Sequence, residues 1–291
     1  MKRSTLSITL LMVLCSQSIV FAQTTYRTIL KDADQAYEGY LGLHYLAVDA
    51  GFNNLSGASV WSIGAEGLYP INEKISAEVL ALYSLLSLEN QGAAFLFNAG
   101  GEFAFMSNYK ERDVPVLLSF TFEDNYFDNT ETQTWETVTL PTQVKREVTA
   151  RGGLYLRRSA FEYVQGFTYY DVSTLTHAGL YAGVGMNWKH YLNFQTSEGD
   201  KAAAGVMFRP FFDLLVLPTK ETVNPGQVEV SGTMGWRTGL TWVFRPYTKA
   251  ENFGRKIRFF GNSIFRLEMG KRPLEGFYVT TGMGWAFKKF R

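Results

Sequence analysis

The sequence predicts an all-β protein that closes into a transmembrane antiparallel up-and-down β-barrel of about twelve strands. Three observations favour this fold. Apolar residues alternate with polar or small residues along most of the chain. The alternating stretches are longer than the roughly 5 to 6 residues usual for strands of soluble proteins. No stretch of about 18 or more apolar residues, as a membrane-spanning helix requires, occurs in the sequence.

The alternation is clearest in two stretches. From Leu180 to Lys189 the even positions are apolar, and the odd positions carry Tyr, Gly, Asn or Lys. From Val228 to Phe244 most even positions are again apolar, and all the residues between them except Val243 are polar or glycine. A period of two is that of a β-strand. Segments of about ten residues, apolar on one face and polar on the other, are typical of barrels in the bacterial outer membrane.

Twelve segments follow this pattern, and ten and fourteen strands are the even-numbered alternatives. The expected strands are Tyr37–Val48, Gly57–Tyr69, Lys74–Leu88, Ala93–Met106, Asp113–Asp124, Gln143–Arg157, Ala160–Asp171, His177–Phe194, Lys201–Leu217, Gln227–Arg245, Lys256–Gly270 and Gly276–Phe290.

The first residues have the features of a secretory signal peptide. Lys2 and Arg3 precede an apolar stretch from Leu6 to Leu14, and Val20 and Ala22 fit the cleavage-site positions. We therefore expect three parts: residues 1–22 are a cleaved signal peptide, residues 23–36 a short periplasmic segment, and residues 37–291 the barrel.

The last expected strand contains Thr280, Gly282, Trp285 and Phe287. This spacing resembles the C-terminal assembly signal of bacterial outer-membrane β-barrel proteins. The resemblance implies insertion by the barrel-assembly machinery into the outer membrane of a Gram-negative bacterium, among lipids and lipopolysaccharide. One departure is the tail of residues 288–291, since most members of that family end at or just after the last aromatic residue.

Similar endings recur along the chain. They are Gly100–Phe103–Phe105, Gly183–Met186–Trp188, Gly239–Trp242–Phe244 and, as a near match, Gly64–Gly67–Tyr69. All fall on even-numbered expected strands, which run toward the periplasm if both termini are periplasmic. We expect the aromatic rings at one membrane interface and the glycines on the opposite face of each strand.

The strand assignment places the connections on two sides. Short turns at residues 70–73, 108–112 and 196–200 are expected on the periplasmic side. Residues 49–56, 125–142 and 218–226 are expected on the other side. The segment from Asn125 to Thr142 is the longest, so we expect it to be an external loop, where binding functions concentrate.

Charged residues occupy the polar faces of the expected strands. The residues expected to place their charges in the lumen are Glu38, Glu66, Glu102, Arg151, Arg209, Glu229, Arg237 and Arg266. Acidic residues dominate the early strands and basic residues the later ones. Either the charges pair across a narrow interior and close it, or the two walls create a transverse field across a water-filled pore. The inward positions of Leu80, Leu82 and Leu86 predict an apolar patch or a contact with the N-terminal segment.

No catalytic or metal-binding constellation emerges, so we expect a protein that is not an enzyme and has no cofactor. Some outer-membrane lipid hydrolases carry a serine two residues after the catalytic histidine. None of the three histidines has this neighbour, although Ser173 and His177 leave lipid hydrolysis as a minor alternative. Cys15, the single cysteine, lies in the signal peptide. The formal charge of +1 argues against binding of nucleic acid.

A basic group formed by Arg255, Lys256 and Arg258 is expected at a periplasmic strand end. It either reaches toward lipid phosphates or docks a partner. Together these features predict a non-enzymatic scaffold or accessory subunit of an outer-membrane complex. The alternative is a narrow, porin-like passive channel for small solutes.

Overall fold

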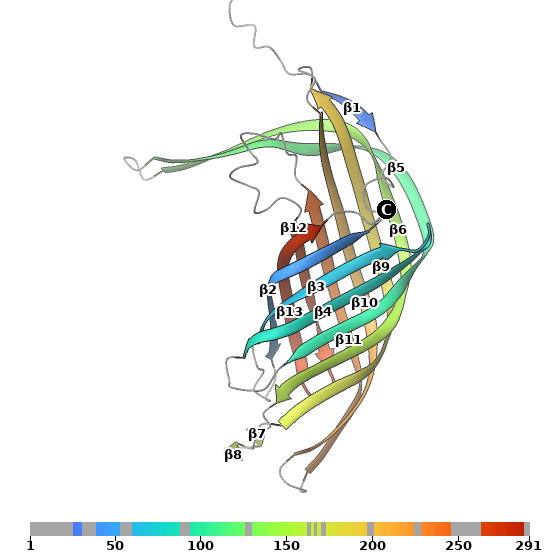
Figure 1. The fold of residues 1–291 in the computed structure, drawn as a ribbon, viewed down its shortest axis with the longest axis vertical. Helices are drawn as coiled ribbons and strands as arrows, with labels where there is room; N and C mark the ends of the chain where they lie inside the picture. The colour runs from blue at the N-terminus through green and yellow to red at the C-terminus, as the bar shows by residue number, and fades with distance from the viewer. Residues whose placement is uncertain are drawn as a thin grey trace, which may run out of the picture.

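The alternating segments form the strands of a closed antiparallel β-barrel in the computed structural model of the chain (Figure 1). The structure describes residues 26–30, 39–52, 60–87, 94–125, 130–161, 164–165, 168–169, 173–196, 201–223, 228–245 and 263–287. Within these residues ten strands make up the barrel wall. The predicted fold class is confirmed, and the number of strands is ten, which was one of the stated alternatives to twelve.

The wall strands follow one another in chain order. They are β2 (Tyr40–Phe52), β3 (Val60–Pro70), β4 (Ile75–Ser87), β5 (Phe95–Asn125), β6 (Thr130–Phe161), β9 (Ser173–Thr196), β10 (Lys201–Val223), β11 (Val228–Arg245), β12 (Ser263–Arg272) and β13 (Gly276–Phe287). Each pairs with the next, and β13 pairs with β2 to close the barrel. A short strand, β1 (Tyr26–Leu30), pairs with the end of β9.

The expected count of twelve was too high by two. The segments Ala93–Met106 and Asp113–Asp124 belong to one continuous strand, β5. The expected turn at residues 108–112 lies inside it and pairs with β6. The charged run resembles a turn in sequence, yet residues 107–113 are all exposed, and a paired strand with exposed side chains also accommodates charges.

The second overcount is Ala160–Asp171. Its first two residues end β6, and a small hairpin of β7 (Val164–Gln165) and β8 (Thr168–Tyr169) lies outside the wall. Aromatic residues on both faces of this segment give no consistent alternation. Both errors fall between the ending on β5 and the ending on β9, so they cancel, and the aromatic endings still lie on strands of one direction: β3, β5, β9, β11 and β13.

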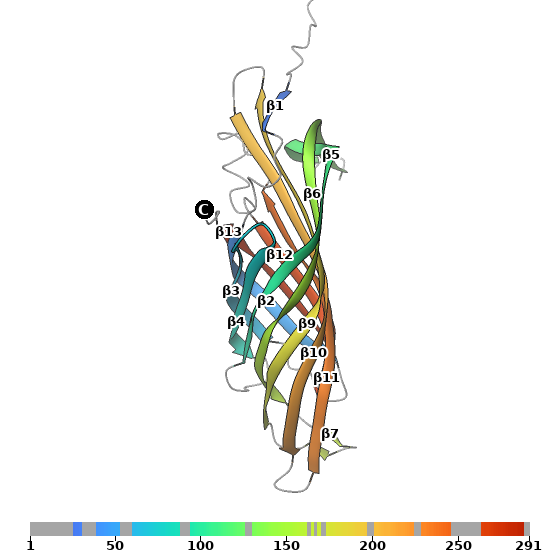
Figure 2. The same ribbon diagram turned by 90° about the vertical axis from the view of Figure 1, so that its right-hand side faces the viewer.

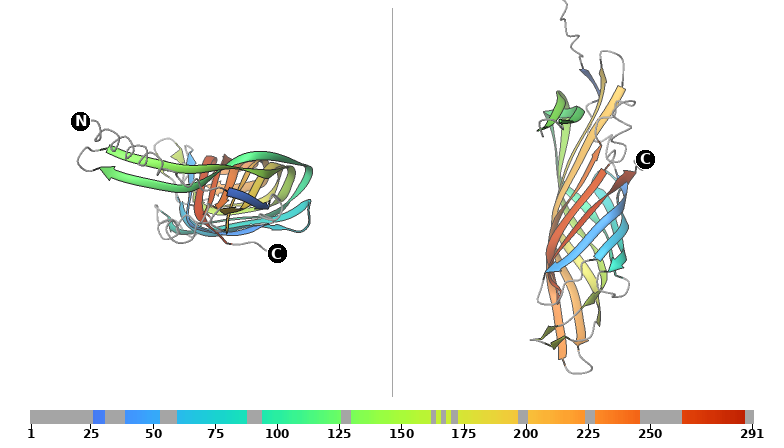
Figure 3. Two further views of the ribbon diagram at one scale, coloured as in Figure 1. Left: turned by 90° about the horizontal axis from the view of Figure 1, so that it is seen from above. Right: turned by 90° about the vertical axis from the view of Figure 1, so that its left-hand side faces the viewer.

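Strands β5 and β6 continue together beyond the barrel wall (Figures 1 and 3). We call residues 107–125 of β5 and 130–143 of β6 the ribbon. The barrel end from which it projects, which also carries the Ile71–Lys74 turn, is the ribbon end. The other is the distal end, where β12 turns into β13.

The expected external loop at Asn125–Thr142 was therefore wrong. Most of it is strand β6, and it lies on the side of the Ile71–Lys74 turn rather than opposite to it. The false turn at residues 108–112 reversed the direction assigned to the chain from there to the second error, at residues 160–171.

The outer surface of the barrel is apolar. Exposed side chains on the wall include Leu43, Trp61, Ile63, Val79, Phe103, Leu154, Leu180, Val184, Phe212, Leu214, Met234 and Trp242. Among the described wall residues, the outward charges are Arg158 and Lys271 near the distal end and Arg146 at the ribbon end. No helix of the described residues is long and apolar enough to cross a membrane.

The barrel is flattened, so that β2 to β4 face β9 to β12 across a narrow interior (Figures 2 and 3). One buried apolar cluster lies toward the distal end: Ala47, Leu80, Leu82, Leu96, Tyr155, Tyr181, Leu215 and Leu217. A second lies at the ribbon end: Tyr40, Leu68, Met207, Val243, Ile264 and Ala286. Leu80 and Leu82 thus belong to an apolar patch, while the side chain of Leu86 lies outside the described residues.

Candidate functional site: the charged barrel interior

Opposite charges line the two broad walls of the barrel. Carboxylates come from β2 to β5: Asp49, Glu66, Glu78 and Glu102. Guanidinium groups come from β6 and β10 to β12: Arg151, Arg157, Arg209, Arg237, Arg266 and Arg272. Alternation points these residues inward, and flattening brings the two walls within reach of one another.

The centre of the barrel is bridged by Arg151 and Arg209. The Nη2 atom of Arg151 donates to Oε1 of Glu78 at 2.7 Å, and its Nε lies 3.3 Å from Oε1 of Glu102. Arg209 pairs with the same two carboxylates and also donates from Nε to Asn187 at 3.1 Å. Two arginines on one wall therefore share two glutamates on the other.

A second group of charges continues from this bridge around the basic wall. Arg237 donates from Nε to Asp213 at 2.9 Å, and Arg266 donates from Nη2 to Glu268 at 2.8 Å. Arg266 also reaches Glu66 on the acidic wall at 3.3 Å. Such buried charges are tolerated because each one is paired and hydrogen-bonded.

A third group closes the distal end. Arg157 and Arg272 both donate to Asp49, at 2.8 Å and 3.1 Å, and both pair with Glu275 of the β12–β13 turn. The hydroxyl of Thr280 donates to the other oxygen of Asp49 at 2.7 Å. This end is crosslinked by two guanidinium groups and two carboxylates.

Aromatic rings pack among these charges. The guanidinium of Arg237 lies 4.4 Å from the ring centre of Tyr181, and that of Arg151 lies 4.1 Å from Phe211. The hydroxyls of Tyr181 and Tyr278 donate to Glu78 and Glu268, each at 2.7 Å. The rings fill space that water would occupy and supply cation–π attraction.

Two glycines of the repeated endings make room for this packing. A Cβ at Gly100 would lie 2.3 Å from the hydroxyl oxygen of Tyr181. A Cβ at Gly183 would lie 2.4 Å from a carboxylate oxygen of Asp213. The inner face of the wall is therefore too crowded for a larger side chain at these two positions.

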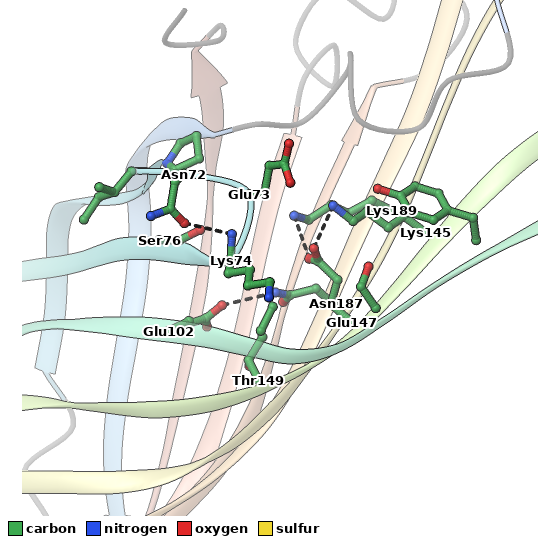
Figure 4. A pocket seen from close by; sticks show the side chains of 15 residues that line it. Asn72, Glu73, Lys74, Ser76, Glu102, Lys145, Glu147, Thr149, Asn187 and Lys189 are labelled. Carbon is green, nitrogen blue, oxygen red and sulfur yellow. Dashed lines mark hydrogen bonds and ion pairs between the residues drawn. The ribbon is translucent and has the colours of Figure 1, made fainter.

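Open space inside the barrel lies at the ribbon end. A cavity of about 600 Å³ lies between the Ile71–Lys74 turn and strands β5, β6 and β9 (Figure 4). Deeper, among Glu78, Glu102, Arg151 and Arg209, the void measures about 10 Å³. That is at most the space of a single water molecule, so the cavity ends at the central charges.

The structure places the predicted lumen residues as follows. Buried inside the barrel are Glu66, Glu102, Arg151, Arg209, Arg237 and Arg266. Glu38 lies outside the described residues, and so does the side chain of Glu229 on β11. The acidic and basic walls pair directly instead of facing each other across open water.

The assembly-signal residues lie on β13. Thr280 and Gly282 face the interior, where Gly282 lies beside the ring of His44. Trp285 and Phe287 lie on the outer face, and Phe287 is exposed. The docking candidates Arg255, Lys256 and Arg258 lie outside the described residues.

Several residues of the network were missed by sequence reasoning. Asp49 was assigned to a loop, but it belongs to β2 and binds two arginines. A register shift between His44 and Ala47 breaks the alternation, so inward residues change from even to odd numbers. Arg272 and Glu275 sit at a tight turn, where sequence periodicity gives no direction.

A scan against models of known protein families finds no match, and a search of curated proteins finds no significant match either. Among the described residues there is no group of three or more His, Cys, Asp or Glu that could hold a metal ion.

Proposed function

We propose that this chain is an integral outer-membrane β-barrel that acts as a non-enzymatic scaffold or accessory subunit of an outer-membrane complex. One observation carries the proposal: side chains fill the middle of the barrel, while β5 and β6 extend beyond its wall. A barrel filled in this way acts through its surfaces, and the ribbon is a large projecting surface.

The membrane location is supported by the exterior. The outward side chains of the wall form an apolar belt, and the few outward charges lie near the two ends of the barrel, as a bilayer requires. Aromatic strand endings gather at the ribbon end, in keeping with an interfacial belt. If the termini are periplasmic, as in the barrels that the C-terminal motif resembles, the ribbon is periplasmic too.

The ribbon extends past the strands that flank β5 and β6 in the barrel wall. Within the described residues, β5 pairs with β4 only up to Phe103, and β6 pairs with β9 only from Val144 onward. Unpaired backbone N–H and C=O groups favour the addition of another strand. The edge of β9 beyond the barrel is already occupied in this way by β1.

The channel hypothesis has one observation in its favour, the cavity at the ribbon end. For a solute to pass farther, Arg151 and Arg209 would have to release Glu78 and Glu102. Conductance that changes when Arg151, Arg209 or Arg237 is neutralised would support this function over the scaffold.

Lipid hydrolysis gains no comparable support. The Nε2 atom of His177 lies 2.8 Å from the backbone oxygen of Pro273, and that of His44 lies 3.1 Å from Glu66. The lipid-hydrolase hypothesis requires at least that the protein hydrolyses lipid and that this activity disappears in Ser173→Ala or His177→Ala. The absence of enzymatic activity stays a prediction.

The scaffold is tested by purifying tagged protein from outer membranes in mild detergent and measuring the mass and composition of the complex. The matched variant replaces residues 117–137 by Asn-Gly, which joins Val116 to Val138, a paired position in the ribbon. We expect a stoichiometric partner with the full chain and its loss with the shortened ribbon.

Two results would contradict the proposal. One is a full-length protein that purifies alone or as a homo-oligomer. The other is stable conductance through the full-length barrel in planar bilayers that persists when co-purifying proteins are added and that changes in Arg209→Gln. That result would favour the channel.

A further inference from the structure

Arg146 of β6 lies on the outer face of the barrel at the ribbon end, and no described residue supplies its countercharge. Its guanidinium lies 5.4 Å from the ring centre of Trp188, the residue paired with it on β9. The buried Nε atom of Arg146 has no hydrogen-bond partner among the described residues. A guanidinium has five N–H donors, so this side chain is ready to bind an added anion.

The neighbouring strand adds a second cation to the same face. On β5, Asn108 pairs with Arg146 and Lys110 pairs with Val144. Lys110 is therefore the diagonal neighbour of Arg146, and such neighbours on one face of a sheet are about 7 to 8 Å apart. Lys110 is exposed and forms no ion pair with a described residue. One small anionic group can contact both side chains.

Carboxylates near these cations lie on the opposite face. The outward, even-numbered residues of 106–112 on β5, 142–148 on β6 and 186–190 on β9 include neither Asp nor Glu. Alternation places Glu111 on the face of Tyr109, which lines the cavity. Three more carboxylates of this end line the cavity as well: Glu73, Glu102 and Glu147 (Figure 4). The outward face therefore carries an excess of positive charge.

Apolar surface continues from the two cations toward the middle of the wall. Trp188 stacks on Phe208 of β10 with 5.5 Å between the ring centres. Val148 and Met186 form the next outward pair, and Met106 beside them is 62% exposed. Tryptophan prefers the interface of a bilayer. If Trp188 lies there, Arg146 and Lys110 lie at the depth of the lipid phosphates and the apolar residues face the acyl chains.

We propose that Arg146 and Lys110 bind the phosphate of a phospholipid with a net negative headgroup, such as phosphatidylglycerol. The acyl chains of this lipid lie on the apolar surface around Trp188. Two cations favour it over a zwitterionic lipid, whose own ammonium group balances the phosphate. The inference rests on the membrane location contained in the proposed function, and it adds a specific lipid site to the scaffold.

The test uses the full-length protein in phosphatidylcholine vesicles and measures which lipid contacts Trp188. A fixed fraction of either phosphatidylglycerol or phosphatidylcholine carries brominated acyl chains, which quench tryptophan fluorescence on contact. The contribution of Trp188 is the difference between each protein and the same protein with Trp188→Phe. We expect phosphatidylglycerol to be enriched at Trp188 by about fivefold or more, since each cation near a membrane surface contributes about that factor.

Variants assign the contacts. Arg146→Gln should lower the enrichment by about fivefold, and Lys110→Gln by a smaller factor, because Lys110 is more exposed. Arg146→Lys should give an intermediate value, since it keeps the charge but loses the bidentate geometry. Lys74→Gln removes an equal charge at the same end on the cavity side, so this matched control should keep the enrichment. Circular dichroism and the shift in gel mobility on heating verify folding of each variant.

The outcomes separate this site from the membrane location. If neither brominated lipid quenches the tryptophans, the protein is not in the membrane, and both the proposed function and the lipid site are overturned. If both lipids quench Trp188 equally, the lipid site alone is overturned. The same holds if enrichment is equal in wild type, Arg146→Gln and Lys110→Gln. Should Arg146→Gln fail to fold, Lys110→Gln and the comparison of the two lipids still decide the matter.

Discussion

Strands β5 and β6 are paired throughout, but they lie in two different environments. In the barrel wall, from Phe95 to Phe103, β5 has a neighbour on each side and exposes apolar residues outward while burying Asn98 and Glu102. In the ribbon, from Ser107 to Asp113, the residues are polar or aromatic and exposed. Pairing alone therefore does not make a barrel wall.

The difference lies in what covers each face. In the wall, the inner face meets charges and rings from the opposite wall, and each polar group finds a partner there. In the ribbon, residues 107–113 of β5 expose both of their faces, and only a few side chains of β6, such as Leu140 and Thr142, are buried. The same substitution should therefore have unequal effects in the two regions.

The largest effect is expected from removing a central buried charge. Arg209→Met leaves Glu78 and Glu102 with one arginine between them, and should lower the free energy of unfolding by about 3 to 5 kcal/mol. Arg112→Met in the exposed ribbon should change it by less than about 0.5 kcal/mol. Urea unfolding in lipid vesicles, followed by tryptophan fluorescence, measures both.

The double variant Arg209→Met/Glu102→Gln sharpens this comparison, because it removes a carboxylate together with its partner. We expect it to recover part of the stability lost in Arg209→Met. Equal losses in the single and double variants would argue against a network held by these pairs.

The next effect concerns the outer face. Val184→Arg places a charge on the apolar belt, where about 2 to 4 kcal/mol of destabilisation is expected near the bilayer midplane. Asn108→Arg, on the exposed ribbon, should be close to neutral. A neutral Val184→Arg in vesicles would count against a lipid-facing wall.

Two adjacent glycines on β5 give a smaller and more local comparison. Gly100→Ala puts a methyl group 2.3 Å from both the Tyr181 hydroxyl and a backbone oxygen, and overpacking of this kind costs about 1 to 3 kcal/mol. Gly101→Ala meets one atom, at 3.2 Å. Thermal unfolding should separate the two, and equal midpoints would contradict the crowding at Gly100.

The smallest effect on stability is expected from shortening the ribbon. Replacing residues 117–137 by Asn-Gly removes no strand from the barrel wall, so the unfolding free energy should change by less than about 1 kcal/mol. Failure of this variant to insert into vesicles would show that the ribbon contributes to folding of the barrel.

Local pattern determined much of this protein. Alternation and strand length predicted an antiparallel barrel, and the glycine–aromatic endings marked strands of one direction. Counting failed where the local signal was ambiguous: the charged run from Lys110 to Asp113 suggested a turn, and the aromatic segment after Ala160 suggested a strand. The register shift near His44 hid Asp49 from any rule based on a strict period of two.

The sequence also assigned opposite charges to early and late strands, because residue type and strand order are local properties. Which carboxylate meets which guanidinium was decided by the tertiary structure alone. Arg209 meets Glu102 across 107 positions and Tyr40 across 169 positions. Such contacts depend on closure and flattening of the barrel, which no period in the sequence encodes.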